Sequence, residues 1–402
     1  MTAETGTERD RIGSWCGWVM TCAAALTPLL AWLGPLGFAP LMGLVGLLCL
    51  PAFRLPEPDR PLAIVLLLGL AWAAVSSLWS VHRPDELEDS VALKLALQLP
   101  LYWAAWCGAR RADRAGRVRA LKVFAWGLAL YGALLLVEAF TGAGVYRALR
   151  DAIGDPIRPD LGRKNIAHGS FALALLWPVA AAAGLRAGAP AWLALPMAGG
   201  AAVVAQVFGS DAPVLAVLLA ASIGVAVWAW PRTAPRFLAV GAAFYVLLMP
   251  VVVLALRGSF PHLQASWAQR VGYWLHALDA IAQHPFRGSG LDASRAFGPG
   301  IQLHPHNGAL QIWLELGALG AVLAALVLAA VFRGLSRPER SLVSAAAAGS
   351  AAVYVLFGAV SFGVWQEWWL ALGALAAVIA TLAADGMPRT AAKPSTSTAI
   401  SG

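Results

Sequence analysis

The chain has 402 residues, of which 59% are hydrophobic and only 12% are charged. Soluble domains carry about 25% charged residues, so this composition excludes a soluble globular enzyme, and the high apolar content excludes a disordered protein. The net charge of +8 does not indicate a nucleic-acid partner, because the positive residues lie in short loops between apolar segments and form no basic domain face. An all-α polytopic membrane protein is the class that remains.

Twelve apolar segments are predicted as membrane spans, because a span needs about 20 apolar residues. They lie at approximately 15–33, 36–53, 61–79, 90–107, 119–140, 166–185, 191–208, 212–230, 236–256, 307–332, 341–361 and 363–384. Two tight hairpins, at Gly34-Pro35 and between Gly209 and Pro213, could instead lie inside longer helices. The first span is expected to be an uncleaved signal anchor, since no small-residue cleavage site accompanies it.

The distribution of Lys and Arg predicts the orientation, because cytoplasmic loops carry an excess of both. With a cytoplasmic N-terminus, the inner loops hold most of the basic residues, including a cluster from Arg110 to Lys122. Both termini are then cytoplasmic. This divides the chain into spans one to nine (1–256), an outer loop (257–306), spans ten to twelve (307–384) and a disordered cytoplasmic tail (385–402).

Two outer segments keep positive charge against this bias. The loop 141–165 contains Arg147, Arg150, Arg158, Arg163 and Lys164. The loop 257–306 contains Arg257, Arg270, Arg287 and Arg295. Positive charge on the outer side indicates an anionic ligand. The alternative is that long loops are exempt from the positive-inside rule, and the second loop approaches that length.

The loop 257–306 is predicted to contain a helix of its own. Apolar residues recur at spacings of four, three, four and three, at Trp267, Val271, Trp274, Leu278 and Ile281, which is the pattern of one apolar helical face. We expect this helix to lie along the outer membrane–water boundary. Arg270 falls at the edge of that face, where it reaches a lipid phosphate or stacks on an indole ring.

A polar motif follows this helix. In His304-Pro305-His306-Asn307, the proline ends any preceding helix and Asn307 is suited to cap the next one. This places His306 at the outer end of the tenth span. Asn307, Gln311 and Glu315 follow at i, i+4 and i+8, so they form a polar stripe that enters the bilayer. Polar groups in a span are normally functional or mutually paired.

The residues around this motif resemble the O-antigen ligase family. His306-Asn307, nine further residues, Gly317, two residues and Gly320 match the signature His-Asn-x9-Gly-x-x-Gly. A segment shared across the broader ligase and polymerase superfamily is similar to Arg270, Trp274, His284-Pro285, Gly288 and Gly290. Twelve spans with a large outer loop after the ninth also match. The chain departs from many ligases at Ala321-Val322, where they have Thr-Thr.

The resemblance implies a GT-C-like glycosyltransferase of lipopolysaccharide biosynthesis. In such an enzyme a sugar hydroxyl of lipid A-core attacks a glycan on undecaprenyl diphosphate, at the periplasmic face of the bacterial inner membrane and without a cofactor. The resemblance makes His306 the general base. By resemblance, Arg163 and Arg270 correspond to two family arginines, and we assign both to diphosphate binding. From their positions at the same outer face, Lys164 is added to diphosphate binding, and supporting roles are assigned to Asn307, Gln311, Glu315, His304 and Asn165.

The residue types suit this chemistry independently of the resemblance. A diphosphate leaving group calls for fixed positive charge, and the fork of arginine binds two oxygens at once. The acceptor hydroxyl calls for a base that is partly neutral near pH 7, which describes histidine. The sixth and tenth spans both begin at the outer face, so their N-terminal amides point at the same interface.

The sequence leaves alternatives open at the level of single residues. His304 could be the base, with His306 as a capping residue. Lys94, inside the fourth span, could pair with Glu367 at the last outer hairpin, or extend its amine to the interface. No spacing of acidic residues matches a metal cage, so no metal site is expected.

Three other functions also stay open. A polymerase is consistent with Arg158-x10-Gly169 and Arg287-x10-Gly298, although glycine is frequent enough here for such matches to arise by chance. A protein O-oligosaccharyltransferase belongs to the same superfamily. A transporter or flippase is disfavoured, because the ionisable residues gather at one face and no internal repeat is apparent.

Overall fold

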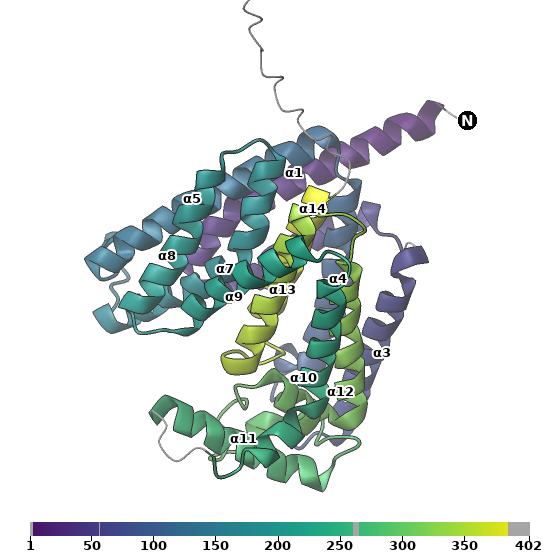
Figure 1. Ribbon diagram of the computed structural model, residues 1–402, viewed down its shortest axis with the longest axis vertical. Helices are drawn as coiled ribbons and strands as arrows, with labels where there is room; N and C mark the ends of the chain where they lie inside the picture. The colour runs from purple at the N-terminus through teal and green to yellow at the C-terminus, as the bar shows by residue number, and fades with distance from the viewer. Residues whose placement is uncertain (1–2, 56, 260–264, 385–402) are drawn as a thin grey trace, which may run out of the picture.

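The computed structural model describes residues 3–55, 57–259 and 265–384, and this part of the chain is helical without any strand (Figure 1). The α-helices are α1 Ala3–Leu33, α2 Phe38–Leu48, α3 Arg60–Ser76, α4 Val91–Arg111, α5 Arg114–Thr141, α6 Gly144–Ala152, α7 Pro159–Arg186, α8 Ala194–Val207, α9 Ala212–Ala229, α10 Ala234–Ala255, α11 Ala265–Gln283, α12 Gly308–Gly334, α13 Leu342–Val360 and α14 Glu367–Ala384. Short 3-10 turns lie at Pro35–Gly37, Leu50–Ala52, Glu57–Asp59, Ser77–Trp79, Leu87–Asp89, Ala191–Leu193 and Ala293–Ala296. The predicted tail 385–402 lies outside the described residues.

Every predicted span coincides with a helix, and the two further helices, α6 and α11, lie in the two basic loops. Nine of the described helices are long and apolar enough to cross a membrane. α2 and α8 are shorter apolar helices, and α4 interrupts its apolar residues with Lys94 and Gln98. The fold is that of a polytopic membrane protein, while the number of twelve spans stays a prediction. Both predicted hairpins separate distinct helices.

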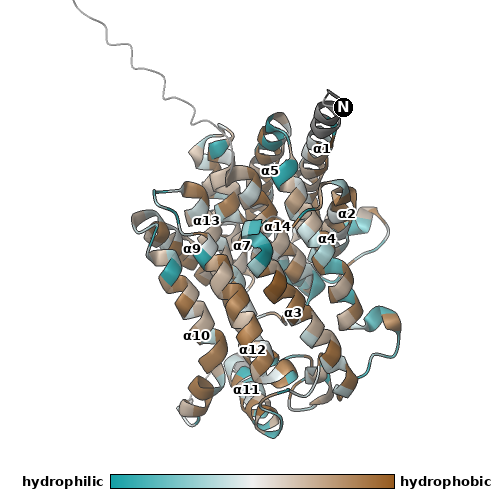
Figure 2. Cartoon of the chain, turned by 90° about the vertical axis from the view of Figure 1, so that its right-hand side faces the viewer, coloured by the Kyte–Doolittle hydropathy of each residue, from teal (hydrophilic) through white to brown (hydrophobic). Residues whose placement is uncertain are grey.

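α7 lies at the centre of the packed helices. Of its apolar window, 78% is buried inside the protein, compared with 17% for α3 and for α10. α5 and α8 approach at backbone contact, because a Cβ on Gly132 would lie 2.1 Å from the carbonyl oxygen of Pro196. Small residues allow such close approach between helices in membranes. Figure 2 shows mostly hydrophobic residues along α3 and α10, and several of these, including Leu67 and Phe237, are exposed.

α11 and the start of α1 lie at opposite ends of the bundle (Figures 1 and 2). The end of α14 lies towards the start of α1, away from α11. The two ends of the described chain are therefore remote from the loop 257–306, as the predicted topology requires. The side of the membrane at which each end lies stays a prediction.

The helix predicted in the second loop is present as α11, and its position along the outer membrane–water boundary stays a prediction. Val271 and Ile281 are buried, and Trp274 packs in a cluster with Leu310 and Leu314 of α12. The apolar face is therefore covered largely by protein. The periodicity identifies an apolar face, but it does not distinguish lipid from neighbouring helices as the partner of that face.

Candidate active site

The predicted motif lies at the N-terminus of α12. Asn307 is the N-cap, as predicted, and its side-chain oxygen accepts from the N–H of Leu310 at 3.1 Å. The hydroxyl of Tyr245 in α10 donates to the same oxygen at 3.4 Å, and the indole of Trp274 donates to the carbonyl of Pro305 at 3.0 Å. His306 itself has φ +51°, a backbone conformation that residues other than glycine rarely adopt. Its neighbours, rather than local preference, hold it there.

The imidazole of His306 is fixed in one orientation. Its Nδ1 lies 2.9 Å from the carbonyl oxygen of Ser361, and because a carbonyl only accepts, Nδ1 carries the proton and Nε2 keeps a lone pair. The ring stacks on Tyr273, with centroids 6.0 Å apart. Burial lowers the pKa of His306, the Ser361 carbonyl opposes that change, and Arg270 adds to it. A neutral ring with an open Nε2 is the state that a general base requires.

His304 has a different environment. Its side chain is buried, and its Nδ1 accepts from the backbone N–H of His306 at 3.2 Å. Burial lowers the pKa of His304 to about 3, with smaller contributions from His306 when that ring is protonated and from the charge of Arg295. His304 therefore shapes the turn as a neutral acceptor. This geometry favours His306 over His304 as the base.

The polar stripe of α12 is internally paired. Gln311 donates through Nε2 to Glu315 Oε1 at 3.0 Å and accepts through Oε1 from the N–H of Val364 at 3.0 Å. Glu315 is completely buried, and its carboxylate also accepts from the indole of Trp365, the N–H of Asp292 and the hydroxyl of Ser294. The stripe therefore joins the loops on both sides of His306 to one helix. Its role is to position them.

α12 is broken at Gly317, which has φ +65° and ψ −163°. The break frees backbone carbonyls in the preceding turn, and these find partners outside the helix. The carbonyls of Leu314, Glu315 and Leu316 accept from the N–H of Ser289, the N–H of Gly290 and the indole of Trp72, at 2.8, 2.9 and 2.9 Å. Irregular backbone at membrane depth is tolerated where protein satisfies its hydrogen bonds, as it does here.

The glycines of the two sequence motifs meet at this break. A Cβ on Gly317 would lie 2.4 Å from the carbonyl oxygen of Phe286, and a Cβ on Gly288 would lie 2.3 Å from that of Glu315. Both glycines also have positive φ, which side chains disfavour. The loop that follows α11 therefore crosses the broken helix at backbone contact. The spacing of the motifs reflects this crossing.

Arg270 projects from α11, and no carboxylate of the described residues forms an ion pair with it. Its guanidinium carbon lies 5.1 Å from the centre of the Trp267 ring, so the cation–π contact considered from the sequence is present. Its Nε is buried and has no hydrogen-bond partner among the described residues, and burial lowers the pKa of Arg270. Arg270 also influences the pKa of His306. An unpaired guanidinium beside the candidate base is suited to bind an anion.

The first basic loop contains two kinds of cation. Arg150 and Arg158 form ion pairs within the loop, with Asp155 and Asp160 respectively. Arg163 and Lys164 are exposed on the second turn of α7, and no ion pair or hydrogen bond of their side chains occurs within the described residues. Asn165, expected to support the site, donates to the carbonyl of Trp32 at 3.1 Å, so its role is to attach α7 to α1.

Arg147 is an unpaired cation that the sequence did not distinguish from the rest of its loop. Its Nε is buried without a partner in the described structure, and its Cγ would lie 3.2 Å from a Cβ on Gly162. Arg163 lies in the same corner, with Nη2 3.5 Å from the corresponding position on Gly142. In the sequence, Arg147 could be noticed only as one of several basic residues in the outer loop 141–165, where the positive-inside rule disfavours Lys and Arg.

The α6–α7 corner is connected to His306 through packed aromatic rings. Phe171 of α7 lies 5.1 Å from Phe362 between ring centres, and Phe362 follows Ser361, whose carbonyl binds His306. Arg163 and Lys164 lie two turns before Phe171 on the same helix. No described contact brings either of them to His306, so their share in one site stays a prediction.

Lys94 and Glu367 form the ion pair that was considered from the sequence. Nζ of Lys94 lies 2.9 Å from Oε1 of Glu367, and Gln98 donates to the other carboxylate oxygen at 2.8 Å. The positive charge of Lys94 in α4 is therefore neutralised by a carboxylate of α14. Beside it, His82 Nε2 lies 3.7 Å from the carboxylate of Asp292, whose pKa is raised by burial. The first contact links α4 to α14, and the second links the connection between α3 and α4 to the loop that follows α11.

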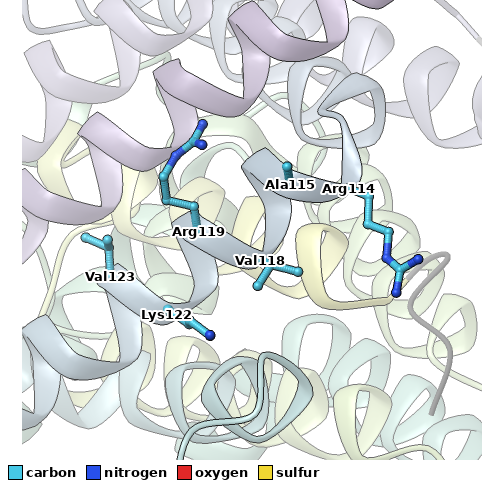
Figure 3. Close-up of a pocket in the computed structure, with 6 residues that line it drawn as sticks. All are labelled: Arg114, Ala115, Val118, Arg119, Lys122 and Val123. Carbon is cyan, nitrogen blue, oxygen red and sulfur yellow. The ribbon is translucent and has the colours of Figure 1, made fainter. Parts of the chain in front are cut away.

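A cavity of about 740 Å³ lies elsewhere, on the first turns of α5. Figure 3 shows that its basic side chains diverge, with Arg119 turned towards α1 and Arg114 and Lys122 pointing away from it. The guanidinium carbon of Arg119 lies 3.7 Å from the centre of the Trp18 ring. The side chains do not converge on one ligand. No group of three His, Cys, Asp or Glu side chains within the described residues is arranged to hold a metal ion.

Part of the chain is similar in sequence to known proteins. Residues 193–325 match the family model described as O-antigen ligase. A "Putative polysaccharide ligase" of Rickettsia conorii is 30% identical over 124 residues, which cover 27% of this chain and 30% of that protein. One of the same description in Rickettsia prowazekii is 32% identical over 127 residues, covering 27% and 31%. The chain therefore aligns with less than a third of the length of these relatives.

The matched region contains α8 to the middle of α12, with Arg270, His306 and the glycines of the broken helix. Arg147, Arg163 and Lys164 lie outside it. The resemblance inferred from the signature is therefore confirmed for the half of the site that carries the candidate base. For the basic α6–α7 corner, which consists of Arg147, Arg163 and Lys164, the argument depends on the geometry of the structure alone.

Proposed function

We propose, from the match of residues 193–325 to the O-antigen ligase family model, that the chain is a glycosyltransferase that transfers a glycan from undecaprenyl diphosphate to a sugar hydroxyl of lipid A-core. The reaction takes place at the periplasmic face of the bacterial inner membrane and needs no metal. The observation that carries the proposal is the imidazole of His306, whose Nδ1 is bound to the Ser361 carbonyl and whose Nε2 has no hydrogen-bond partner among the described residues.

In the proposed reaction, Nε2 of His306 removes the proton from the acceptor hydroxyl while the oxygen attacks the anomeric carbon of the glycan. The bond between that carbon and the diphosphate oxygen breaks, and undecaprenyl diphosphate leaves with the electron pair. The imidazolium that forms keeps its Nδ1–H bond to the Ser361 carbonyl, which stabilises the charge. The lowered pKa of His306 keeps the ring ready to accept a proton near pH 7.

The leaving diphosphate is stabilised by cations that have no partner of their own. Arg270 is nearest to His306 in this assignment, and Arg163, Lys164 and Arg147 supply further charge from the α6–α7 corner. The start of α12 adds backbone amides, because the N-terminus of a helix favours anions. Arg150, Arg158 and Arg295 are not assigned to this task, since each is already bound to a carboxylate.

Reconstitution with a lipid-linked glycan tests the function. The purified protein in liposomes receives a glycan on undecaprenyl diphosphate, together with lipid A-core, a second donor molecule or an acceptor protein, in the presence of a metal chelator. We expect glycan on lipid A-core and release of undecaprenyl diphosphate. Product only on the second donor identifies a polymerase instead, and product only on the protein identifies an oligosaccharyltransferase. Loss of product with the chelator contradicts metal independence.

A further inference from the structure

An apolar groove lies between two consecutive helices, α9 and α10. α9 packs mainly on α13 and α10 packs mainly on α12, so the two helices diverge after their short connection. The space between them is a groove of about 790 Å³, a size within the range of about 300–1,000 Å³ that is typical of ligand sites. Divergent packing of neighbouring helices is thus the structural origin of the groove.

The walls of the groove are apolar along its length. They consist of Leu219 and Ile223 from α9, Phe237 and Leu238 from α10, and Val355 and Leu356 from α13. Polar atoms come from Trp230 and Thr233, at the connection between α9 and α10, and from Tyr245. They therefore lie towards its two ends. No charged side chain lines the groove, so it suits a long hydrocarbon chain.

One end of the groove reaches the candidate active site. The hydroxyl of Tyr245 donates to Asn307 at 3.4 Å, and Asn307 directly follows His306. On the opposite wall, Ala359 of α13 lines the groove, two residues before Ser361, whose carbonyl binds the His306 ring. Both walls thus end within two residues of the contacts that hold His306.

The groove is also long. Its α10 wall extends from Thr233 to Tyr245, which corresponds to about 18 Å at about 1.5 Å per residue. The hydrocarbon core of a bilayer is about 30 Å thick. A chain whose polar end lies at the N-terminus of α12 can therefore follow the groove through more than half of the membrane.

We propose that this groove holds the isoprenoid tail of the lipid-linked donor. The inference rests on the proposed function and adds the location of the donor's lipid. An isoprenoid tail is uncharged and has no hydrogen-bonding group, so an apolar groove accommodates it without leaving a polar atom unpaired. Continuity with His306 selects the donor, because its reacting carbon and its diphosphate must lie at the end of the groove where the base is.

Gly241 offers a way to fill the groove. It lines the groove, and a Cβ placed on it meets no atom within 4 Å, so Gly241→Leu and Gly241→Trp introduce their side chains at a point of the groove where the Cβ is free of contacts. Gly43 of α2 is the matched control, because a Cβ there also meets no atom within 4 Å and Gly43 does not line the groove.

Photocrosslinking in proteoliposomes tests the proposal without requiring turnover. The probe is undecaprenyl diphosphate with a diazirine in the tail, compared with a phosphatidylglycerol that carries the diazirine in an acyl chain, and labelled peptides are mapped by mass spectrometry. We expect the prenyl probe to label α9, α10 and α13, with competition by unlabelled undecaprenyl diphosphate. Gly241→Trp reduces this labelling about tenfold, which corresponds to a loss of about 1.4 kcal/mol in binding, and Gly43→Trp leaves it unchanged.

Equal labelling by both probes without competition identifies an ordinary lipid-facing surface and overturns the proposal, as does labelling of the prenyl probe on other helices. The outcome is separable from the proposed function. His306→Ala abolishes transfer but keeps the labelling if both proposals hold. If the wild-type protein is labelled in the groove but transfers no glycan, the groove proposal stands and the proposed activity is contradicted. If it transfers glycan without labelling of the groove, the proposed activity stands and the groove proposal is contradicted.

Discussion

The N-terminus of α12 and the α6–α7 corner hold their polar side chains in opposite ways. Around α12, Asn307, Gln311 and Glu315 each have several hydrogen-bond partners, and His306 is bound through one ring nitrogen. In the corner, Arg147 and Arg163 lie against glycines without a carboxylate. Two further arginines of the same loop are paired.

This difference separates positioning from binding. A general base must be held in one orientation and one tautomer, so its surroundings are saturated with hydrogen bonds. A cation that binds a substrate anion must be without a partner before the substrate arrives, because a carboxylate already bound to it competes with the anion. Partnering therefore indicates which arginines of a basic loop are available to a ligand.

Removal of the base is expected to have the largest effect. His306→Ala reduces the transfer rate by about 10²–10⁴-fold, the usual contribution of a general base. The control is His276→Ala, which alters an exposed histidine of α11 and leaves the rate near that of the wild type. Initial rates of glycan transfer in liposomes provide the measurement. Wild-type activity in His306→Ala contradicts the assignment.

A side chain at the break in α12 is expected to have the next largest effect, which is a loss of stability. Gly317→Ala places a Cβ 2.4 Å from the Phe286 carbonyl oxygen at φ +65°, and such backbone strain costs about 1–3 kcal/mol. Thermal unfolding in detergent should show a lower midpoint. Gly334→Ala, at the end of the same helix and with no atom within 4 Å of a Cβ, should unfold as the wild type does. An unchanged midpoint for Gly317→Ala removes the argument that glycine is required.

The two classes of arginine should respond differently to the same substitution. Arg147→Gln and Arg163→Gln each raise the KM for the lipid-linked donor about tenfold, since a charge-assisted hydrogen bond contributes about 1.5–3 kcal/mol. Arg158→Gln breaks an exposed pair with Asp160 and should change KM by less than about twofold, because exposed ion pairs contribute little. Equal effects on all three KM values contradict the distinction between paired and unpaired cations.

The smallest expected effect is a displacement of the pH profile. Arg270 lowers the pKa of His306, because a nearby positive charge disfavours protonation of the ring. Arg270→Gln removes that charge, so the pKa of His306 rises and the acid limb of the rate profile moves to higher pH. Arg270→Lys retains the charge and should retain the position of the limb. A limb that moves to lower pH in Arg270→Gln contradicts the proximity of the two residues.

Local signals determined much of what the sequence could predict. Apolar length identified the helices, the period of about 3.6 residues identified α11, and the order Pro305-His306-Asn307 located the cap of α12. The signature identified a family that comparison confirmed over residues 193–325. Each of these features depends on residues within a few turns of one another, so the chain itself carries the information.

Tertiary packing decided which of these residues can act. The tautomer of His306 depends on Ser361, 55 residues away, and the pairing of Lys94 depends on Glu367 at the start of another helix. Likewise, the availability of Arg147, the passage of a loop across Gly317 and the groove between α9 and α10 depend on which helices pack together. Apolar faces in a membrane protein look alike in sequence, and only the arrangement of the helices determines whether protein, lipid or substrate covers them.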